Sequence, residues 1–444
     1  MKKLLTAALF LFSVLAEGYA QEASVAQEAQ EAREAIGQDP QRTAGTFYVY
    51  DGADLPAMTP APKGYKPFYI SHFARHGARY CTSEYDTFYG WLKKASEAGA
   101  LCDGGKEFFS RYEPFYEKVR LRKGNLTALG KEQHRQIARR MYSRFPAVFK
   151  GPTRIEAFST ESPRVIMSMW SCLSRLEELD RDVEVVADAS ARYATWLQPP
   201  LPSNPYFIKG RFEADGETLA AHAAWFGENV PWKIIAKRFF SSENVLREVL
   251  GVTPLRFIEI LHSVVTGTYC LDEDRGCFDD VFSDEELYQI WEGLSARYFL
   301  TIARYGGSKG LAADYGAYVL EEMIASADED IYSGDTRLRL RFSHDSSIAP
   351  LIVFMDLDGA GKVAGSFDET LSIFPSYRLP MASSVQLVFF RKKGGKMLVK
   401  VLLNEREATL PFPAVDGPYY LWDDFKAYYA PRIAASRSKI ESAL

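Results

Sequence analysis

The sequence predicts an α/β fold, with a mostly parallel central sheet flanked by helices and an all-helical insertion lobe. Two segments of strand character, ending near residues 75 and 343, are each followed by a cluster of titratable residues. Between residues 209 and 330 the apolar pattern is helical throughout. A chain of 444 residues that is 47% hydrophobic can bury a large core, and we expect two lobes.

The first of these segments contains the apolar run Phe68-Tyr69-Ile70, which is typical of a buried strand. The turn after it carries Arg75, His76, Gly77 and Arg79. Guanidinium groups bind phosphate oxyanions bidentately, and glycine allows close approach of the backbone. A histidine between two arginines can be a nucleophile, a base or only a hydrogen-bond donor. The pattern favours a phosphate pocket with His76 in line to attack phosphorus.

The second segment, Thr336 to Ser343, alternates Leu and Arg and stops at His344-Asp345, and an apolar helix follows from Ile348 to Met355. In open α/β sheets, ligands bind at the carboxyl ends of the strands, so we expect the two clusters to meet there. Taken alone, a buried His-Asp pair equally suits a structural tie between loops. Beside the first cluster, catalysis is the favoured interpretation.

A third strand, Arg154 to Ser159, precedes a helix that we expect from Val165 to Leu179, with Ser162 as its cap and Pro163 at its first position. Arg164 then lies in the first turn, where the helix dipole disfavours a cation. This placement favours an anion in front of Arg164. The alternative is a surface salt bridge with Glu161.

The other elements follow from apolar periodicity and turn residues. We expect helices at residues 84–98, 108–119 with a break at Pro114, 128–145 capped by Thr127, 283–305 opened by a capping box at Ser283, and 312–327, and strands at 182–188, 385–390 and 397–403. Residues 46–50 form a short aromatic stretch, interpreted as an arm packed on the body. The chain closes with a helical tail from Trp422 to Leu444.

Arg75-His76-Gly77-Ala78-Arg79 resembles the Arg-His-Gly-x-Arg signature of the histidine phosphatase superfamily, and His344-Asp345 resembles the downstream pair of its acid phosphatase and phytase branch. The resemblance implies that His76 is the nucleophile and Asp345 the proton donor. It also implies that Arg75, Arg79, Arg164 and His344 bind the phosphoryl group. The chain departs from the family at Cys81, where a proline is usual.

Gly124 to Gly130 resembles the Gly-x-Leu-Thr-x-x-Gly segment of the same branch. A basic cluster lies just before this segment. Within it, Arg122 and Lys123 are the candidates to lie at the rim of the phosphate pocket and contact further phosphates of a polyanionic substrate. A solvated basic loop is the equal alternative.

The predicted organisation begins with a signal peptide, residues 1–20, in which Lys2 and Lys3 precede an apolar run too short to span a bilayer. Residues 21–45 are expected to be a mobile leader. Residues 46–205 and 331–444 are assigned to the α/β core, and residues 206–330 to a helical insertion lobe over the site. The protein is therefore expected to be exported to the periplasm or beyond, without stable membrane insertion.

Five cysteines leave at least one unpaired, and Cys270 with Cys277 is the favoured disulfide. No Cys or His spacing indicates a metal site, and no cofactor is expected. The net charge of −5 does not favour nucleic acid as a partner, so the expected partner is a small phosphomonoester. The sequence does not determine the oligomeric state.

The resemblance implies phosphomonoester hydrolysis through a phosphohistidine. The sequence around residues 66–72 resembles bacterial relatives of the multiple inositol-polyphosphate phosphatases, which favours inositol polyphosphates such as phytate. His344-Asp345 is the pair of phytases and general acid phosphatases, so a broad-specificity acid phosphatase is the alternative. Transfer to an acceptor other than water, or a non-catalytic phosphate-binding cell-envelope module, are the further alternatives.

Overall fold

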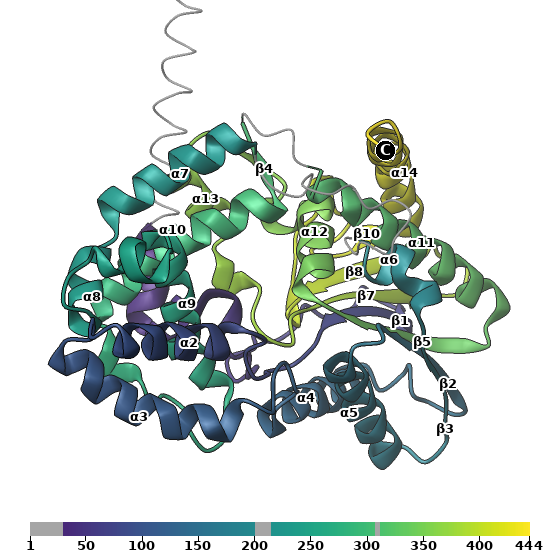
Figure 1. Cartoon of the computed structure of the whole chain (residues 1–444). Coiled ribbons are helices and arrows are strands. Elements are labelled where there is room, and N and C mark those ends of the chain that lie inside the picture. Colours follow the sequence, from purple (N-terminus) through teal and green to yellow (C-terminus); the bar gives the residue numbers. More distant parts are fainter. Residues whose placement is uncertain (1–29, 200–214, 307–310) are drawn as a thin grey trace, which may run out of the picture.

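The computed structural model describes residues 30–199, 215–306 and 311–444. Within these residues one eight-stranded sheet has the order β10-β8-β7-β1-β5-β2-β3, with β9 beside β8 (Figure 1). The strands are β1 (Lys66–Arg75), β2 (Thr153–Ser159), β3 (Val183–Ala189), β5 (Thr336–Ser343), β7 (Ser384–Arg391), β8 (Leu398–Leu403), β9 (Arg406–Glu407) and β10 (Tyr420–Leu421). A separate pair joins β4 (Arg304–Tyr305) to β6 (Val363–Ala364).

The centre of the sheet is parallel, since β1 pairs with β5, β5 with β2 and β2 with β3 in that sense. Strand β7 is antiparallel to both β1 and β8, so β8 runs in the same direction as β1. The predicted α/β fold with a mostly parallel sheet is confirmed.

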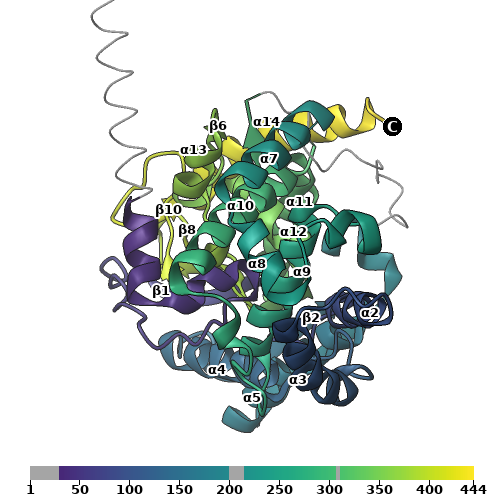
Figure 2. The same cartoon turned by 60° about the vertical axis from the view of Figure 1, so that its left-hand side comes forward.

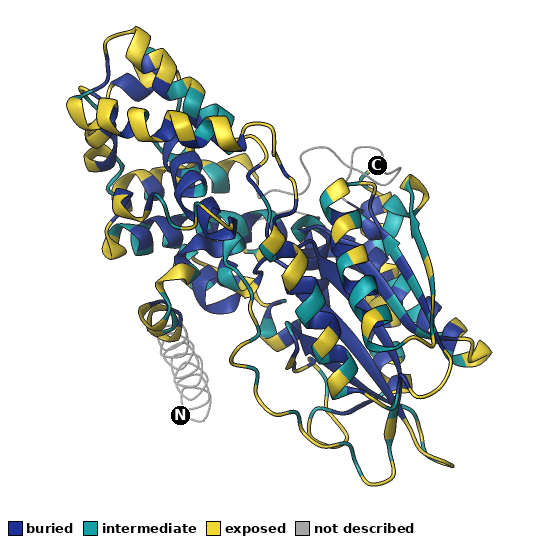
Figure 3. Cartoon of the chain, turned by 90° about the horizontal axis from the view of Figure 1, so that it is seen from below, coloured by how far each residue is buried: buried dark blue, intermediate teal, exposed yellow. Residues whose placement is uncertain are grey.

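Helices cover both faces of the sheet (Figure 1). On one face lie α4 (Ala128–Arg144) and α5 (Pro163–Leu179), and on the other α11 (Gly316–Ser333), α12 (Asp345–Met355) and α14 (Trp422–Glu441). The strands β1, β7 and β8 between them are almost fully buried, whereas β3 at the edge of the sheet has no buried residue (Figure 3). Burial on both faces explains why the strands combine apolar runs with few exposed positions.

Beside the sheet stands a helical lobe (Figure 1), which comes to the front in Figure 2. It contains α2 (Glu84–Glu97), α3 (Asp103–Val119), α7 (Gly216–Asn229), α8 (Trp232–Phe239), α9 (Pro254–Gly267) and α10 (Asp284–Ile302). Two short α-helices are α6 (Ala194–Leu197) and α13 (Phe367–Ile373). The capping box at Ser283 and the Thr127 cap are both present as predicted.

The expected division into core and insertion differs from this packing in two places. Helices α2 and α3, assigned to the core, bury Phe88 and Tyr112 against α8 and α9 of the helical lobe. Helix α11, assigned to the insertion, packs on β5 and α12 instead. Amphipathic periodicity identifies a buried face but not the partner that covers it, which explains both differences.

Helix α3 is continuous, so the predicted break at Pro114 is wrong. Pro114 lies on the exposed side of the helix, while Phe108, Tyr112 and Phe115 are buried. A proline inside a helix costs about 3 kcal/mol, which the packing of this aromatic face outweighs.

The stretch predicted to be a mobile leader is packed where the structure describes it. Residues 30–38 form a helix, followed by the 3-10 helix Pro40–Phe47. Ala32 and Ile36 are buried against Trp291 and Leu371, so apolar contact holds this segment in place. The expected signal peptide, residues 1–20, lies outside the described residues. None of the described helices has the length and hydropathy needed to span a bilayer.

All five cysteines are free, so the expected Cys270–Cys277 disulfide is not formed. Cys270 is buried, and its Sγ lies 3.5 Å from the carbonyl oxygen of Phe47. The thiol therefore points toward the N-terminal segment.

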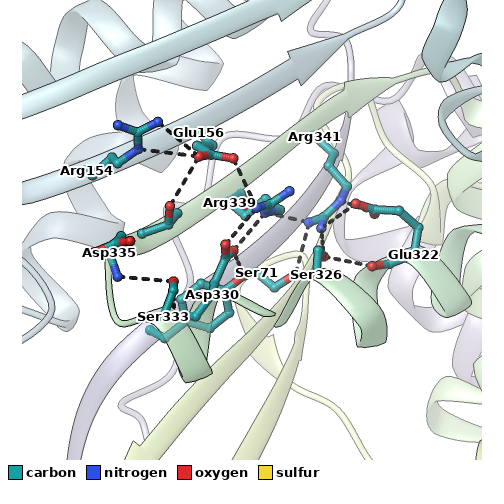
Figure 4. Close-up of polar contacts among 12 residues, drawn as sticks. Ser71, Arg154, Glu156, Glu322, Ser326, Asp330, Ser333, Asp335, Arg339 and Arg341 are labelled. Carbon is teal, nitrogen blue, oxygen red and sulfur yellow. Dashed lines mark hydrogen bonds and ion pairs between the residues drawn. The ribbon is translucent and has the colours of Figure 1, made fainter. Parts of the chain in front are cut away.

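Charged residues are buried between β5 and α11 (Figure 4). Arg341 is 0% exposed, and its guanidinium donates to Glu322 at 2.5 Å and to Ser326 at 2.6 Å. Its Nη1 also reaches Ser71 of β1 at 3.0 Å. These contacts tie the two strands that lead into the site to one covering helix.

Candidate active site

The predicted site residues follow the carboxyl ends of three neighbouring parallel strands, β1, β5 and β2. They therefore lie at the same end of the sheet. Arg75 is the last residue of β1 and lies in register with Ser343, the last of β5. The backbone N–H of His76 donates to the Ser343 carbonyl at 2.9 Å. His344 then caps α12, which begins at Asp345, and Arg164 is the second residue of α5, after β2.

Arg75 is 1% exposed and is held by several oxygen atoms. Its Nη2 donates to Asp345 Oδ2 at 3.0 Å, and its Nη1 donates to the carbonyls of Thr46 at 2.7 Å and Leu379 at 3.0 Å. A charge-assisted pair and two carbonyls fix the guanidinium plane. The Arg75 guanidinium is therefore held in a fixed orientation before any ligand binds.

The His76 ring is in one defined tautomer. Its Nδ1 lies 2.9 Å from the Gly77 carbonyl, which can only accept, so Nδ1 carries the proton. Burial, followed by the charges of Arg75 and Arg79, holds the pKa of His76 well below its usual range. The imidazole is therefore neutral, with an unprotonated Nε2 available for attack on an electrophile.

His344 is bound to Arg164. Arg164 Nη2 lies 3.2 Å from His344 Nδ1 and can only donate, so Nδ1 is the acceptor. Burial, together with Arg164, lowers the pKa of His344 to about 3, and the neutral ring donates from Nε2 to Thr160 Oγ1 at 3.2 Å. Both ring nitrogens thus have protein partners, and His344 orients Arg164.

The three arginines present unused donors. The buried Nε atoms of Arg75, Arg79 and Arg164 have no hydrogen-bond partner within the part of the chain that the structure describes. Burial, with the charges of Arg79 and Arg75, lowers the pKa of Arg164 to about 10, so the guanidiniums repel one another while all remain charged at neutral pH. An oxyanion relieves this repulsion and accepts from these donors.

Asp345 is ionised in the free protein. Burial alone raises the pKa of its carboxyl, but Arg75, Arg79 and His344 together pull the pKa below its usual range. The side chain remains 32% exposed, so it is within reach of a ligand. Asp345, which the resemblance implies to be the proton donor, is therefore a carboxylate in the ligand-free site, because the arginine charges stabilise its ionised form.

Residues that the sequence analysis did not single out hold the motif loop. The N–H of Gly77 donates to Ser168 Oγ at 3.1 Å, and the N–H of Ala78 donates to Gln133 Oε1 at 2.8 Å. A Cβ on Gly77 would lie 2.3 Å from the Gly130 carbonyl oxygen, so the loop requires glycine here. Polar residues on the buried faces of α4 and α5 are the only sequence signal for Gln133 and Ser168.

The two rim candidates are exposed and already paired. Arg122 Nη1 donates to the Tyr80 hydroxyl at 2.6 Å, and Lys123 forms an ion pair with Asp86. A substrate would have to compete with these contacts or extend them. Their role as phosphate ligands stays a prediction.

The fold and this cluster define an α/β protein in which arginines surround a neutral histidine at the carboxyl ends of the central parallel strands. Residues 72–190 match the model of the histidine phosphatase superfamily (branch 2). The resemblance indicated by the motifs is therefore confirmed, and it supports a phosphoric monoester hydrolase. A search of curated proteins finds no match.

Solved structures share the fold. The multiple inositol polyphosphate phosphatase of Bifidobacterium longum, in complex with inositol hexasulfate, is similar with a TM-score of 0.71 and 20% identity, covering 87% of this chain and 97% of that one. The phytase of D. castellii is similar with a TM-score of 0.65 and 14% identity, covering 89% and 85%. At these identities the likeness establishes the fold.

Proposed function

We propose that the protein is an exported phosphomonoester hydrolase that acts through a phosphohistidine on His76. One observation carries the proposal: a neutral His76, with Nε2 unprotonated, lies among three arginines whose Nε donors have no protein partner in the described residues. Such an arrangement suits in-line attack on a bound phosphoryl group. Export rests on the pattern of residues 1–20.

In the first step, Arg75, Arg79 and Arg164 bind the phosphoryl oxygens, and Nε2 of His76 attacks phosphorus. The P–Nε2 bond forms as the P–O bond to the leaving group breaks. The guanidiniums offset the charge on the equatorial oxygens, which is the main task of a phosphoryl-transfer site. The Gly77 carbonyl accepts a hydrogen bond from His76 Nδ1–H throughout and stabilises the developing positive charge on the ring.

Asp345 supplies a proton to the leaving alkoxide. Binding of a phosphate group neutralises part of the arginine charge that keeps this carboxyl ionised, so the pKa of Asp345 rises when the substrate binds. A substrate monoanion brings the proton, because the second pKa of a phosphomonoester lies near 6. In the second step, ionised Asp345 removes a proton from the water that attacks the phosphohistidine, and inorganic phosphate leaves.

Inositol polyphosphates such as phytate are the proposed substrates. Support comes from the names of the structural neighbours and from the exposed cations Arg122 and Lys123 near the motif loop. A broad-specificity acid phosphatase is the alternative if these cations do not engage substrate. Transfer of the phosphoryl group to an acceptor other than water requires that this acceptor react with the phosphohistidine faster than water does.

The test compares phosphate release from phytate and from p-nitrophenyl phosphate near pH 5, without added metal, for the native protein and for His76→Ala. Release from phytate that His76→Ala abolishes, with a ³²P-labelled acid-labile adduct in the native protein only, supports the proposal. Release from the small ester alone rejects the phytate assignment. Phosphate binding without any release favours a non-catalytic phosphate-binding module.

A further inference from the structure

An N-terminal arm, defined here as residues 43–50, contacts the phosphate pocket from a part of the chain that the motifs do not include. The Thr46 carbonyl accepts from Arg75 Nη1 at 2.7 Å. The next residue, Phe47, places its ring beneath Arg79, with the guanidinium carbon 5.3 Å from the ring centroid. Consecutive arm residues thus touch two of the three pocket arginines.

Arg79 depends on few other contacts. Its Nη1 donates to the carbonyl of Tyr80 at 2.9 Å, and its Nε has no hydrogen-bond partner among the described residues. A guanidinium over an aromatic face is attracted by the ring, more strongly as the pair loses contact with water. The Phe47 ring is therefore a major constraint on the plane in which Arg79 presents its donors.

The arm is itself fixed at several points. The Thr43 carbonyl lies 2.9 Å from His262 Nε2 on α9, and the Tyr48 carbonyl accepts from the Met381 N–H at 2.8 Å. Gln133 joins the arm to the motif loop, because its Nε2 donates to the Tyr50 carbonyl at 2.7 Å while its Oε1 accepts from Ala78. The arm is thus held by both the helical lobe and the sheet domain.

We propose that Phe47 is a positioning residue for phosphate binding: its ring orients the Arg79 guanidinium while the adjacent Thr46 carbonyl orients Arg75. This inference rests on the proposed function, in that the pocket is taken to bind a phosphoryl group. It predicts that the arm controls affinity for phosphate rather than stability of the fold.

The test uses Phe47→Leu, which keeps apolar volume without a ring, and Phe47→Tyr, which keeps the ring. The matched control is Phe68→Leu. The guanidinium carbon of Arg391 lies 4.4 Å from the centroid of the Phe68 ring, and Phe68 is near the start of β1, at the end away from Arg75. Calorimetry measures the Kd of inorganic phosphate, kinetics with p-nitrophenyl phosphate give KM and kcat, and thermal denaturation gives Tm.

Phe47→Leu is expected to raise the phosphate Kd and KM by roughly 3- to 30-fold with Tm close to native, because loss of the cation–π contact leaves the Arg79 guanidinium less well oriented. Phe47→Tyr and Phe68→Leu are expected to stay within about twofold of the native values. In an Arg79→Ala background, Phe47→Leu should add nothing, because it acts through Arg79. Should Phe47→Leu not fold, Phe47→Met replaces it.

Unchanged phosphate affinity in folded Phe47→Leu overturns the inference, as does a full additional loss in the Arg79→Ala background. If the native protein binds phosphate but does not hydrolyse the ester, the hydrolase proposal fails while the calorimetric test of the arm still stands. If the native protein does not bind phosphate, both proposals fail.

Discussion

Arg75 and Asp345 form an ion pair, with Nη2 and Oδ2 3.0 Å apart, although the two residues are 270 positions apart in the chain. The pair links the end of β1 to the start of α12. Because a bound phosphoryl group and Asp345 draw on the same guanidinium, the charge of this carboxyl depends on occupancy of the pocket. In the proposed mechanism, the ion pair therefore couples substrate binding to proton donation by Asp345.

Asp345→Asn tests this coupling through the leaving group. With an alkyl phosphate, whose alkoxide needs a proton, kcat is expected to fall by about 10²- to 10⁴-fold. With p-nitrophenyl phosphate the loss is expected to be much smaller, because p-nitrophenolate leaves without one. Steady-state kinetics with both esters decide the matter, and equal losses would show that Asp345 does not act as the proton donor.

Two buried histidines predict how stability depends on pH. Burial is the main cause that lowers the pKa of both His72 and His134 to about 3. Their pKa in an unfolded chain is about 6.5. Between these values the unfolded chain binds protons that the folded protein does not, so the free energy of unfolding falls as the pH falls.

His134→Leu is expected to reduce this slope, since it removes one of the buried histidines whose pKa is lowered in the folded protein, while keeping an apolar side chain beside Phe342. Urea denaturation at pH 7, 6 and 5 measures it. The native protein should lose stability faster than the variant as the pH is lowered. Parallel curves would mean that His134 titrates alike in both states.

The site was largely predictable because its motifs are local. Arg75, His76, His344 and Asp345 directly follow strands whose patterns are readable, and parallel pairing brings them together. The arm was not predictable as part of the site, because only tertiary packing places Phe47 beneath Arg79. For the same reason the packing partners of α2, α3 and α11 were not predictable: periodicity specifies a buried face, and the partner depends on the whole fold.

The contact between the motif loop and α4 predicts a strict requirement for glycine. A Cβ on Gly130 would lie 2.1 Å from the Ala78 carbonyl oxygen, so Gly130→Ala must displace the backbone beside His76. Overpacking of this kind costs about 1–3 kcal/mol, and kcat should fall as well. Gly90→Ala in α2 is the control, because a Cβ there would have nothing within 4 Å and alanine favours helix. Similar Tm values for the two variants would contradict the requirement.

The buried charges beneath the site give the last prediction. Arg341 is 0% exposed and pairs with Glu322 at 2.5 Å, so Glu322→Ala leaves a buried guanidinium without its carboxylate (Figure 4). Loss of one partner of a buried pair costs about 3–5 kcal/mol, whereas replacing both by apolar residues costs less. Urea denaturation of Glu322→Ala and of the double variant Glu322→Leu/Arg341→Met compares the two cases.

The double variant is expected to be more stable than Glu322→Ala. Glu184→Ala, which breaks an exposed pair with Arg154, should change the free energy of unfolding by about 1 kcal/mol or less. Arg341 also donates to Ser71 of β1, so the double variant should hold β1 less firmly in register with β5. Its kcat should therefore fall more than that of Glu184→Ala. A double variant less stable than Glu322→Ala would instead show that the charges themselves stabilise the fold.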